Sequence, residues 1–272
     1  MEDLDAAVSR PEHEATQLRD LTMLGIDWDG PVLRQSDRRS VHEDAIGRLQ
    51  AAGRTYRCYC TRREIHAAAS APHGPGPEGA YPGTCLSLTM KERAEREADG
   101  RRPALRLAAG AAVVRVTDTQ CGVIETVVDD FVLQRSDGVP AYNLAVVVDD
   151  AAQGVEQVVR GDDLLSSAPR QAFLGTLLGL APVAYAHVPL VLGPDGRRLA
   201  KRDGAVTLAE RLDQGETVED VVLALLASCG IDTQEVRSPL VALAVFRPSE
   251  LTRAPWVVDP GRPLRGQHRP LG

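Results

Sequence analysis

Three cysteines constrain this chain more than any other feature. Cys58 and Cys60 stand one residue apart in the stretch RCYCTRREI, and Cys85 follows across a stretch rich in proline and glycine. Residues 56–60 are expected to be extended, and in a strand residues i and i+2 point to the same face, so two sulfur atoms lie together. With five cysteines and no recognisable secretory signal, a disulfide framework is not expected. A metal site or buried reduced thiols remain as interpretations.

Composition excludes several classes of protein. The chain has 272 residues, of which 43% are hydrophobic and 25% charged, as is ordinary for one large or two small globular domains. No apolar run reaches membrane-spanning length, so we expect a cytoplasmic protein with no membrane partner. The net charge of −7 argues against a dedicated nucleic-acid binder, although basic residues cluster locally at 197–202.

Two helices are expected near the N-terminus. The first begins at Pro11, ends at Gly25 and should bury one apolar stripe. A capping box of Ser40 and Glu43 predicts the start of the second helix, which stops at Gly53. The residues of the first stripe are Ala15, Leu18, Leu21 and Leu24.

The middle of the chain changes to segments rich in β-branched residues. Another capping box, of Thr61 and Glu64, predicts a short helix before this change. The segments VVRVTD, DFVLQRSDGVPAYNLAVVVDD and VEQVVRG are interpreted as strands, with a hairpin turn at 136–138. A helix in SSAPRQAFLGTLLGL and a turn at Pro194 to Gly196 follow. Strands alternating with helices predict an α/β core.

Three separated segments carry a family resemblance. The N-terminal MEDLDAAVSRPEHEATQLRDLTMLGIDWDGPVLRQS, the central PAYNLAVVVDDAAQGVEQVVRGDDLLSSAPRQ and the basic RRLAKRDGAVTL resemble class I glutamyl-tRNA synthetases in content and order. The resemblance implies an α/β, Rossmann-like class I catalytic fold formed by residues 1–52 and 143–192. It also implies an inserted, zinc-containing and tRNA-contacting domain at 53–142, then a KMSKS-type loop and a mainly helical segment at 193–272.

The short members of this family match better than the long ones, because little chain follows the basic loop. They activate glutamate with ATP and transfer it to the queuosine base of tRNA(Asp). The resemblance therefore implies a ligase with glutamate, ATP and queuosine-containing tRNA(Asp) as substrates. Magnesium is expected to accompany ATP and to neutralise the departing pyrophosphate. A monomer is expected.

The same resemblance implies roles for five residues. Arg160, at the end of a predicted strand, would grip the glutamate carboxylate, although it could equally be a surface arginine. Tyr142 and Glu2 would also face glutamate. Lys201 aligns with the second lysine of the KMSKS-type loop and would act on the ATP phosphates during catalysis, with Arg198 in place of the first lysine.

Two further acids invite a metal interpretation. Asp149 and Asp150 follow VVV and are expected to end a strand. At such a position a solvated or capping pair is a better interpretation than a magnesium cage.

In the short members a zinc ion is held by a C-x-C pair, a tyrosine and a third cysteine, and this chain matches that pattern. On general chemistry alone, His66 or His73 would be a better fourth ligand than a phenol. Three reduced structural thiols remain the alternative. The implied ligands are Cys58, Cys60, Tyr81 and Cys85.

The front of the chain departs from the family. The phosphate-facing A-P-S-P-T-G strand and the HIGH motif, which receives ATP at a helix N-terminus, do not occur in the sequence. Three interpretations follow. The chain is an enzyme whose true start lies upstream, incomplete for catalysis as written, or a noncatalytic tRNA-binding or zinc-stabilised relative; a glutamyl-tRNA synthetase fragment is a third possibility.

Overall fold

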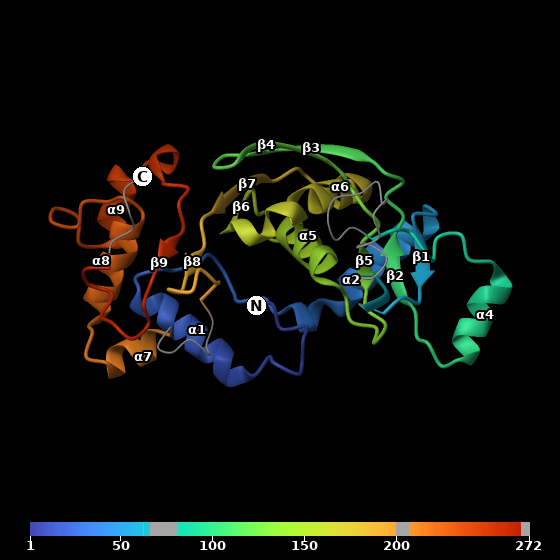
Figure 1. Ribbon diagram of the computed structural model, residues 1–272, viewed down its shortest axis with the longest axis horizontal. Helices are drawn as coiled ribbons and strands as arrows, with labels where there is room; N and C mark the ends of the chain where they lie inside the picture. Colours follow the sequence, from blue (N-terminus) through green and yellow to red (C-terminus); the bar gives the residue numbers. More distant parts are fainter. Residues whose placement is uncertain (62, 66–80, 200–206, 268–272) are drawn as a thin grey trace.

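The computed structural model describes residues 1–61, 63–65, 81–199 and 207–267. The molecule is elongated, with a central sheet and its helices between two smaller ends (Figure 1). One end carries a small sheet that includes Cys58, and the other carries the C-terminal helices. Among the described residues, no helix is long and apolar enough to cross a membrane.

The central sheet has four strands in the order β4, β3, β7, β6. β3 (Val113–Asp118) and β4 (Gly122–Val127) form an antiparallel hairpin, while β7 (Ala184–Val188) runs parallel to β3 and to β6 (Gln157–Gly161). The β-branched runs at 113–118 and 155–161 were therefore correctly predicted as strands, and the α/β class is confirmed. The hairpin also lies within the predicted insertion at 53–142, yet it pairs with the central sheet.

Helices α5 (Tyr142–Ala152) and α6 (Ala168–Leu178) lie beside this sheet (Figure 1). Gly179 adopts φ +65° directly after α6, in the left-handed region that glycine enters without steric cost, and so ends the helix. The 3₁₀ turn η2 (Asp162–Ser167) connects β6 to α6.

The main core lies where α5 and α6 meet α2 (Arg39–Ala51). Five of its leucines are at most 2% exposed, and full burial of one leucine contributes about 1.5–3 kcal/mol. These side chains are Leu49, Leu107, Leu133, Leu144 and Leu174. The core therefore joins the central sheet to the smaller sheet that bears the cysteines.

This smaller sheet is antiparallel in the order β1 (Thr55–Cys58), β2 (Ala104–Leu107), β5 (Val132–Gln134). α4 (Met90–Ala98) lies outside it at the end of the molecule, and its capping box pairs Thr89 with Glu92 (Figure 1). The predicted capping box of Thr61 and Glu64 is also confirmed, with the amide of each residue bonded to the side chain of the other.

The C-terminal end contains three helices and a two-stranded parallel sheet. The helices are α7 (Leu208–Asp213), α8 (Val218–Ser228) and α9 (Pro239–Val245); the strands are β8 (Val191–Leu192) and β9 (Trp256–Val257). Capping boxes start α7 and α8. A short 3₁₀ turn, η4 (Pro248–Glu250), precedes β9.

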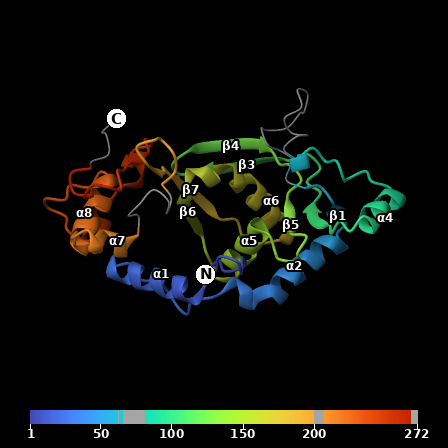
Figure 2. The same ribbon diagram turned by 60° about the horizontal axis from the view of Figure 1, so that its bottom comes forward.

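Helix α1 (Pro11–Met23) begins with the predicted proline but does not bury the predicted stripe. Ala15 and Leu21 are exposed, and only Leu24, beyond the helix, packs against the C-terminal helices. Figure 2 shows α1 and α2 following one another along one edge of the molecule, joined through η1 (Gln35–Arg38). A helix in this position has too few neighbours to cover an apolar face.

Two local predictions were wrong. The segment 142–152 is helix α5, not a strand, because Leu144 and Val148 share one helical face that packs into the main core. Ser40 lies inside α2, whose first residue is Arg39, and no side chain caps that helix. The 3₁₀ turn η1 leads directly into the helix in place of a capping box.

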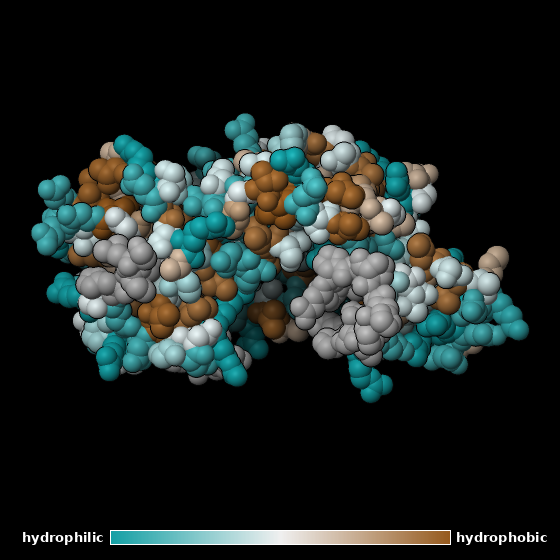
Figure 3. All heavy atoms as spheres, turned by 45° about the horizontal axis from the view of Figure 1, so that its top comes forward, coloured by the Kyte–Doolittle hydropathy of each residue, from teal (hydrophilic) through white to brown (hydrophobic). Residues whose placement is uncertain are grey.

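The outer face of the β3–β4 hairpin carries partly exposed valines. Val113 is 66% exposed, Val123 54% and Val127 40%. Figure 3 shows apolar side chains interspersed with polar ones on the face where this hairpin lies. A mixed surface of this kind is normal for a folded chain.

Candidate active site and metal centre

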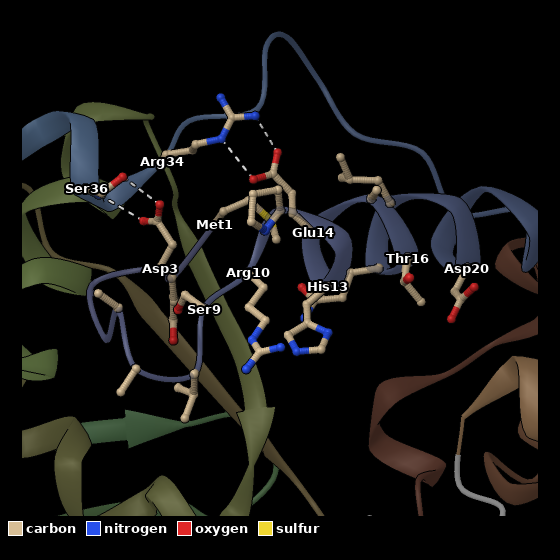
Figure 4. A pocket seen from close by; sticks show the side chains of 18 of the residues that line it. Met1, Asp3, Ser9, Arg10, His13, Glu14, Thr16, Asp20, Arg34 and Ser36 are labelled. Carbon is tan, nitrogen blue, oxygen red and sulfur yellow. Dashed lines mark hydrogen bonds and ion pairs between the residues drawn. The ribbon is translucent and has the colours of Figure 1, made fainter.

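A hollow of about 1520 Å³ lies between the N-terminal segment and helix α1. Asp3 fixes one wall by accepting hydrogen bonds from the amide and hydroxyl of Ser36, at 2.9 and 2.6 Å. Arg34 and Glu14 form a two-bond ion pair across it (Figure 4). Glu2 lines this hollow together with Thr207 from the start of α7. The hollow is therefore bounded by the N-terminal segment and the C-terminal helices.

Arg160 stands at the end of β6, where side chains at the carboxyl ends of parallel strands face a ligand crevice. Its Nε donates to Nε2 of His187 at 3.0 Å, and its Nη1 donates to Oε1 of Gln171 at 2.8 Å. The hydroxyl of Tyr142 and the carbonyl of Leu164 lie 3.4 Å from Nη1 and Nη2, at the long limit for such bonds. Two firm bonds therefore hold the guanidinium, and its remaining N–H groups are available to a carboxylate.

Gln171 is itself held in place. It is 3% exposed, and its Nε2 donates to Oδ1 of Asn143 at 3.0 Å. The side-chain amide is thereby oriented with its oxygen toward Arg160. Helices α5 and α6 thus supply one flank of the site.

His187 is buried at the end of β7 beside Asp118 at the end of β3. Its Nδ1 lies 2.6 Å from Oδ2 of Asp118, and both side chains are 0% exposed. Burial alone would raise the pKa of Asp118, but hydrogen bonds from His187 and from the amides of Cys121 and Gln120 lower it to about 2. Asp118 is therefore an anion in the interior.

The structure places Glu2, Tyr142 and Arg160 around one region. Tyr142 begins helix α5 and is 38% exposed, with its hydroxyl toward Arg160. Burial, and then the charges of Glu2 and Asp149, raise the pKa of Asp150 to about 6, while the charge of Arg160 opposes the rise. The charges of Glu2 and Arg160 thus both act on the carboxyl group of Asp150, in opposite directions.

Asp149 does not end a strand, contrary to prediction, and it is not solvated. It is 4% exposed inside α5, where its Oδ1 accepts from Nε of Arg38 at 2.7 Å and contacts Nε2 of His42 at 3.0 Å. Asp150 is half-buried in the same helix. Neither residue is a capping residue, because both lie in the helix interior and form no N-terminal cap.

The basic loop begins with the predicted turn. Gly193 donates to the carbonyl of Arg197 at 2.8 Å, and Gly196 adopts φ +72° within the turn. Arg198 is exposed and pairs with Asp163 of η2 at 2.5 Å. Lys201 lies outside the described residues, so its predicted role in catalysis and ATP binding stays a prediction, as does that of Arg198.

The cysteines come together as the sequence pattern predicts. Sγ atoms of Cys58, Cys60 and Cys85 all lie within 4.8 Å of one another, and those of Cys60 and Cys85 are 3.5 Å apart. The hydroxyl of Tyr81 is 3.3 Å from Sγ of Cys58 and 3.7 Å from Sγ of Cys60. Four potential ligand atoms therefore surround one point; His66 and His73 lie outside the described residues.

These spacings fit tetrahedral zinc. With zinc–sulfur bonds of about 2.3 Å, neighbouring sulfurs in a tetrahedron lie about 3.8 Å apart, and a sulfur and an oxygen slightly closer. Burial raises the pKa of the Cys60 thiol to about 12. A thiol in this environment needs a nearby cation to ionise, and a metal ion supplies one.

Tyr81 is held from three sides. The guanidinium of Arg106 lies 3.7 Å from its ring centroid, and its hydroxyl accepts from the amide of Cys85 at 2.9 Å. Its own amide donates to Oδ2 of Asp129 at 3.0 Å. The phenol oxygen is therefore fixed toward the sulfurs by contacts that the sequence pattern did not reveal.

Sequence reasoning missed Asp118, His187, Gln171 and Asn143. Asp118 is the last residue of β3, and His187 is the last but one residue of β7. These two strands pair in parallel with one another. Recognising VVRVTD and AYAHV as strands of one parallel arrangement would have pointed to both. Gln171 and Asn143 had no such signal, because both lie on helices.

Comparison with known proteins places this fold in a family. The model of the catalytic domain of class I tRNA synthetases for E and Q matches residues 1–254. The chain therefore belongs to the class I glutamyl- and glutaminyl-tRNA synthetase catalytic-domain family.

Relatives make the comparison more specific. A protein named glutamyl-Q tRNA(Asp) synthetase from Nocardia farcinica is 58% identical, over 95% of this chain and 81% of its own length. One of the same name from Symbiobacterium thermophilum is 47% identical, over 94% and 83%. A crystal structure of a glutamate tRNA ligase from Elizabethkingia meningosepticum shares the fold, with a TM-score of 0.74 at 22% identity, over 94% of this chain and 59% of that chain.

Proposed function

We propose that this protein activates glutamate with ATP and transfers it to the queuosine base of tRNA(Asp). The observation that carries the proposal is the guanidinium of Arg160, held at the end of β6 with donors still available beside the hydroxyl of Tyr142. An arginine fixed in this way can bind a carboxylate through two parallel hydrogen bonds. The names of the relatives, at up to 58% identity, support glutamate as the amino acid and tRNA(Asp) as the acceptor.

The chemistry has two steps. One carboxylate oxygen of glutamate attacks the α-phosphorus of ATP, and the bond to the bridging oxygen breaks so that pyrophosphate leaves. A hydroxyl of the queuosine base then attacks the carbonyl carbon of the adenylate, and AMP leaves. Neither step needs a protein nucleophile, so the protein contributes position and electrostatic stabilisation. Magnesium bound with ATP would neutralise charge on the departing pyrophosphate.

Other residues take supporting parts in this proposal. Glu2 would pair with the ammonium group of glutamate, because its negative charge lies in the same region as Arg160. The Tyr142 hydroxyl would bond to the substrate beside Arg160. Lys201 and Arg198, both in the KMSKS-type loop, would follow the ATP phosphates. Because the proposed acceptor is tRNA(Asp), we expect the protein to act in the cytoplasm.

Zinc is the second part of the proposal. Cys58, Cys60, Tyr81 and Cys85 would hold one ion, which would stiffen the small sheet without entering the reaction. Residues 53–142, apart from the β3–β4 hairpin that pairs with the central sheet, would then act as the inserted, tRNA-contacting part of a Rossmann-like catalytic fold formed by 1–52 and 143–192. The helical segment at 193–272 would complete the molecule.

Pyrophosphate exchange with the full-length protein tests the first step. We expect exchange that depends on glutamate and ATP and proceeds without tRNA. Three acceptors then test the second step: tRNA(Asp) with queuosine, the same tRNA without queuosine, and tRNA(Glu). Only the first should be glutamylated. Charging of tRNA(Glu) would favour a glutamyl-tRNA synthetase, and absence of any glutamate-dependent exchange would leave a noncatalytic relative as the better interpretation.

A further inference from the structure

The contact between Arg160 and His187 fixes the protonation state of the imidazole. Arg160 Nε is 3.0 Å from His187 Nε2, and a guanidinium has hydrogen-bond donors but no acceptor. Nε2 must therefore carry a lone pair and not a proton. An imidazole with a free lone pair on Nε2 is neutral and bears its one proton on Nδ1.

Asp118 supplies the matching partner on the other side of the ring. Its carboxylate accepts from His187 Nδ1 at 2.6 Å and from the amides of Gln120 and Cys121 at 2.8 and 2.7 Å. The amide of His187 donates to the same carboxylate at 3.1 Å. An ionised carboxylate only accepts, so Asp118 requires the proton on Nδ1.

We propose that Asp118 and His187 are positioning residues that orient Arg160 toward the substrate carboxylate by holding His187 in its Nδ1-protonated form. This proposal depends on the proposed function only in taking glutamate as the ligand of Arg160. Without the acceptor on His187, the Nε–H of Arg160 would lose one of its two firm anchors. A long arginine side chain freed in this way samples other rotamers, and binding must then pay the entropy of ordering it.

The Asp118→Asn variant reverses the arrangement with almost no change of shape. The amides of Gln120 and Cys121 both donate to Oδ1 and keep the side-chain oxygen there, so the new NH₂ group takes the place of Oδ2 and faces Nδ1 of His187. Nδ1 must then accept, the ring proton moves to Nε2, and two donors face each other between His187 and Arg160. In other histidine–carboxylate pairs, an aspartate-to-asparagine change leaves the geometry intact but imposes the wrong tautomer on the histidine and impairs function.

Two measurements test this. Long-range ¹⁵N NMR of the wild-type protein should show His187 as the neutral Nδ1–H tautomer, and in Asp118→Asn it should show the Nε2–H form. In pyrophosphate exchange, the variant should raise the KM for glutamate about tenfold or more and leave the KM for ATP unchanged.

A second buried histidine–aspartate pair offers a matched control. His42 contacts Asp149 through Nε2 at 3.0 Å and does not touch Arg160. Asp149→Asn removes a comparable buried carboxylate, so it should change stability while the KM for glutamate stays unchanged. An equal rise in that KM in both variants would indicate a general loss of structure and overturn the proposal.

The NMR measurement needs no substrate and no variant, so it separates this proposal from the proposed function. An imidazolium or an Nε2–H tautomer at His187 in the wild-type protein overturns the positioning pair. The Nδ1–H tautomer supports the pair, even if the protein fails to exchange pyrophosphate with glutamate; in that case the proposed function fails alone. A folded Asp118→Asn variant with unchanged glutamate KM also overturns it.

Discussion

The Arg160 site and the cysteine cluster are both gathered polar groups, but they differ in what their members offer one another. Around Arg160, donors face acceptors: the guanidinium meets a ring nitrogen and an amide oxygen. In the cluster of Cys58, Cys60, Tyr81 and Cys85, the facing groups are three thiols and a phenol, each of which can ligate a metal ion. The contacts between them, at 3.3 to 3.7 Å, are weak hydrogen bonds because sulfur is a weak donor and acceptor.

This difference predicts different consequences of mutation. A network of complementary partners holds its own geometry and can present spare donors to an anion. A cluster of metal-ligating atoms has only weak contacts of its own, so a bound metal ion is needed to hold it together strongly. Damage to the first should therefore appear in substrate binding, and damage to the second in stability.

The largest expected effect is on the cluster. Cys85→Ser should abolish tight binding of zinc, because Cys85 is 0% exposed and its Sγ lies 3.5 Å from that of Cys60. Loss of a structural metal worth about 3 kcal/mol would lower Tm by about 6–12 °C in a chain of this size. Elemental analysis and thermal unfolding measure the two effects.

Cys229→Ser is the matched control, since Cys229 follows α8 far from the cluster along the chain. It should keep one zinc per chain. Chelation of the wild-type protein should lower Tm as Cys85→Ser does, whereas a metal-free wild type of unchanged Tm would argue for three structural thiols. Zinc held equally tightly after Tyr81→Phe would assign the fourth ligand to another group.

The second largest effect is expected at the Arg160 site and concerns substrate binding. Arg160→Lys keeps the positive charge but removes the planar fork, so the KM for glutamate should rise about 10- to 100-fold with little change in Tm. Pyrophosphate exchange at varied glutamate measures it. Arg237→Lys, at an exposed arginine paired with Glu219, should leave both values alone. If Arg160→Lys lowered Tm as much as Cys85→Ser does, the expected difference between the Arg160 site and the cysteine cluster would be wrong.

The smallest expected effect concerns Asp150 and depends on pH. Burial, with Glu2 and Asp149, raises its pKa to about 6 in the folded protein, above the value of 3.8 for a free side chain. The folded state therefore binds more protons between these values, and stability falls as pH rises through this window. Above it, the ionised carboxylate costs about 1 kcal/mol after allowance for solvent screening.

Asp150→Asn should accordingly raise Tm by about 2–4 °C at pH 8 and by much less at pH 3.5, where the carboxyl is mostly protonated in both states. Thermal unfolding at the two pH values measures this. An equal gain at both would trace the effect to packing and not to charge.

The sequence predicted best where one local rule decides the structure. β-Branched residues at 113–118 gave a strand with those limits, and the Thr61 and Glu64 pair formed its capping box. The cysteine spacing correctly predicted that three sulfurs meet. Each of these depends on residues close together in the chain or on a pattern that few other arrangements satisfy.

Prediction failed where distant contacts decide. In 142–152, three valines and two leading apolar residues suggested a strand, but packing against α2 and α6 favours a helix. Along α1 the apolar spacing is helical, yet the helix lies at an edge where none of its residues is fully buried and Leu21 is 37% exposed. The Asp118 and His187 pair is 69 residues apart in sequence, and no local pattern announces it.

Asp129 has a mechanical consequence for the whole molecule. Its Oδ2 accepts from the amide of Tyr81 at 3.0 Å, and its Oδ1 accepts from Nε of Arg170 at 2.6 Å. Arg170 directly precedes Gln171, one of the two firm anchors of Arg160. A single carboxylate therefore links the segment that carries Tyr81 to helix α6, which also supplies Gln171 to Arg160, and these two parts can separate only after one of its hydrogen bonds has broken.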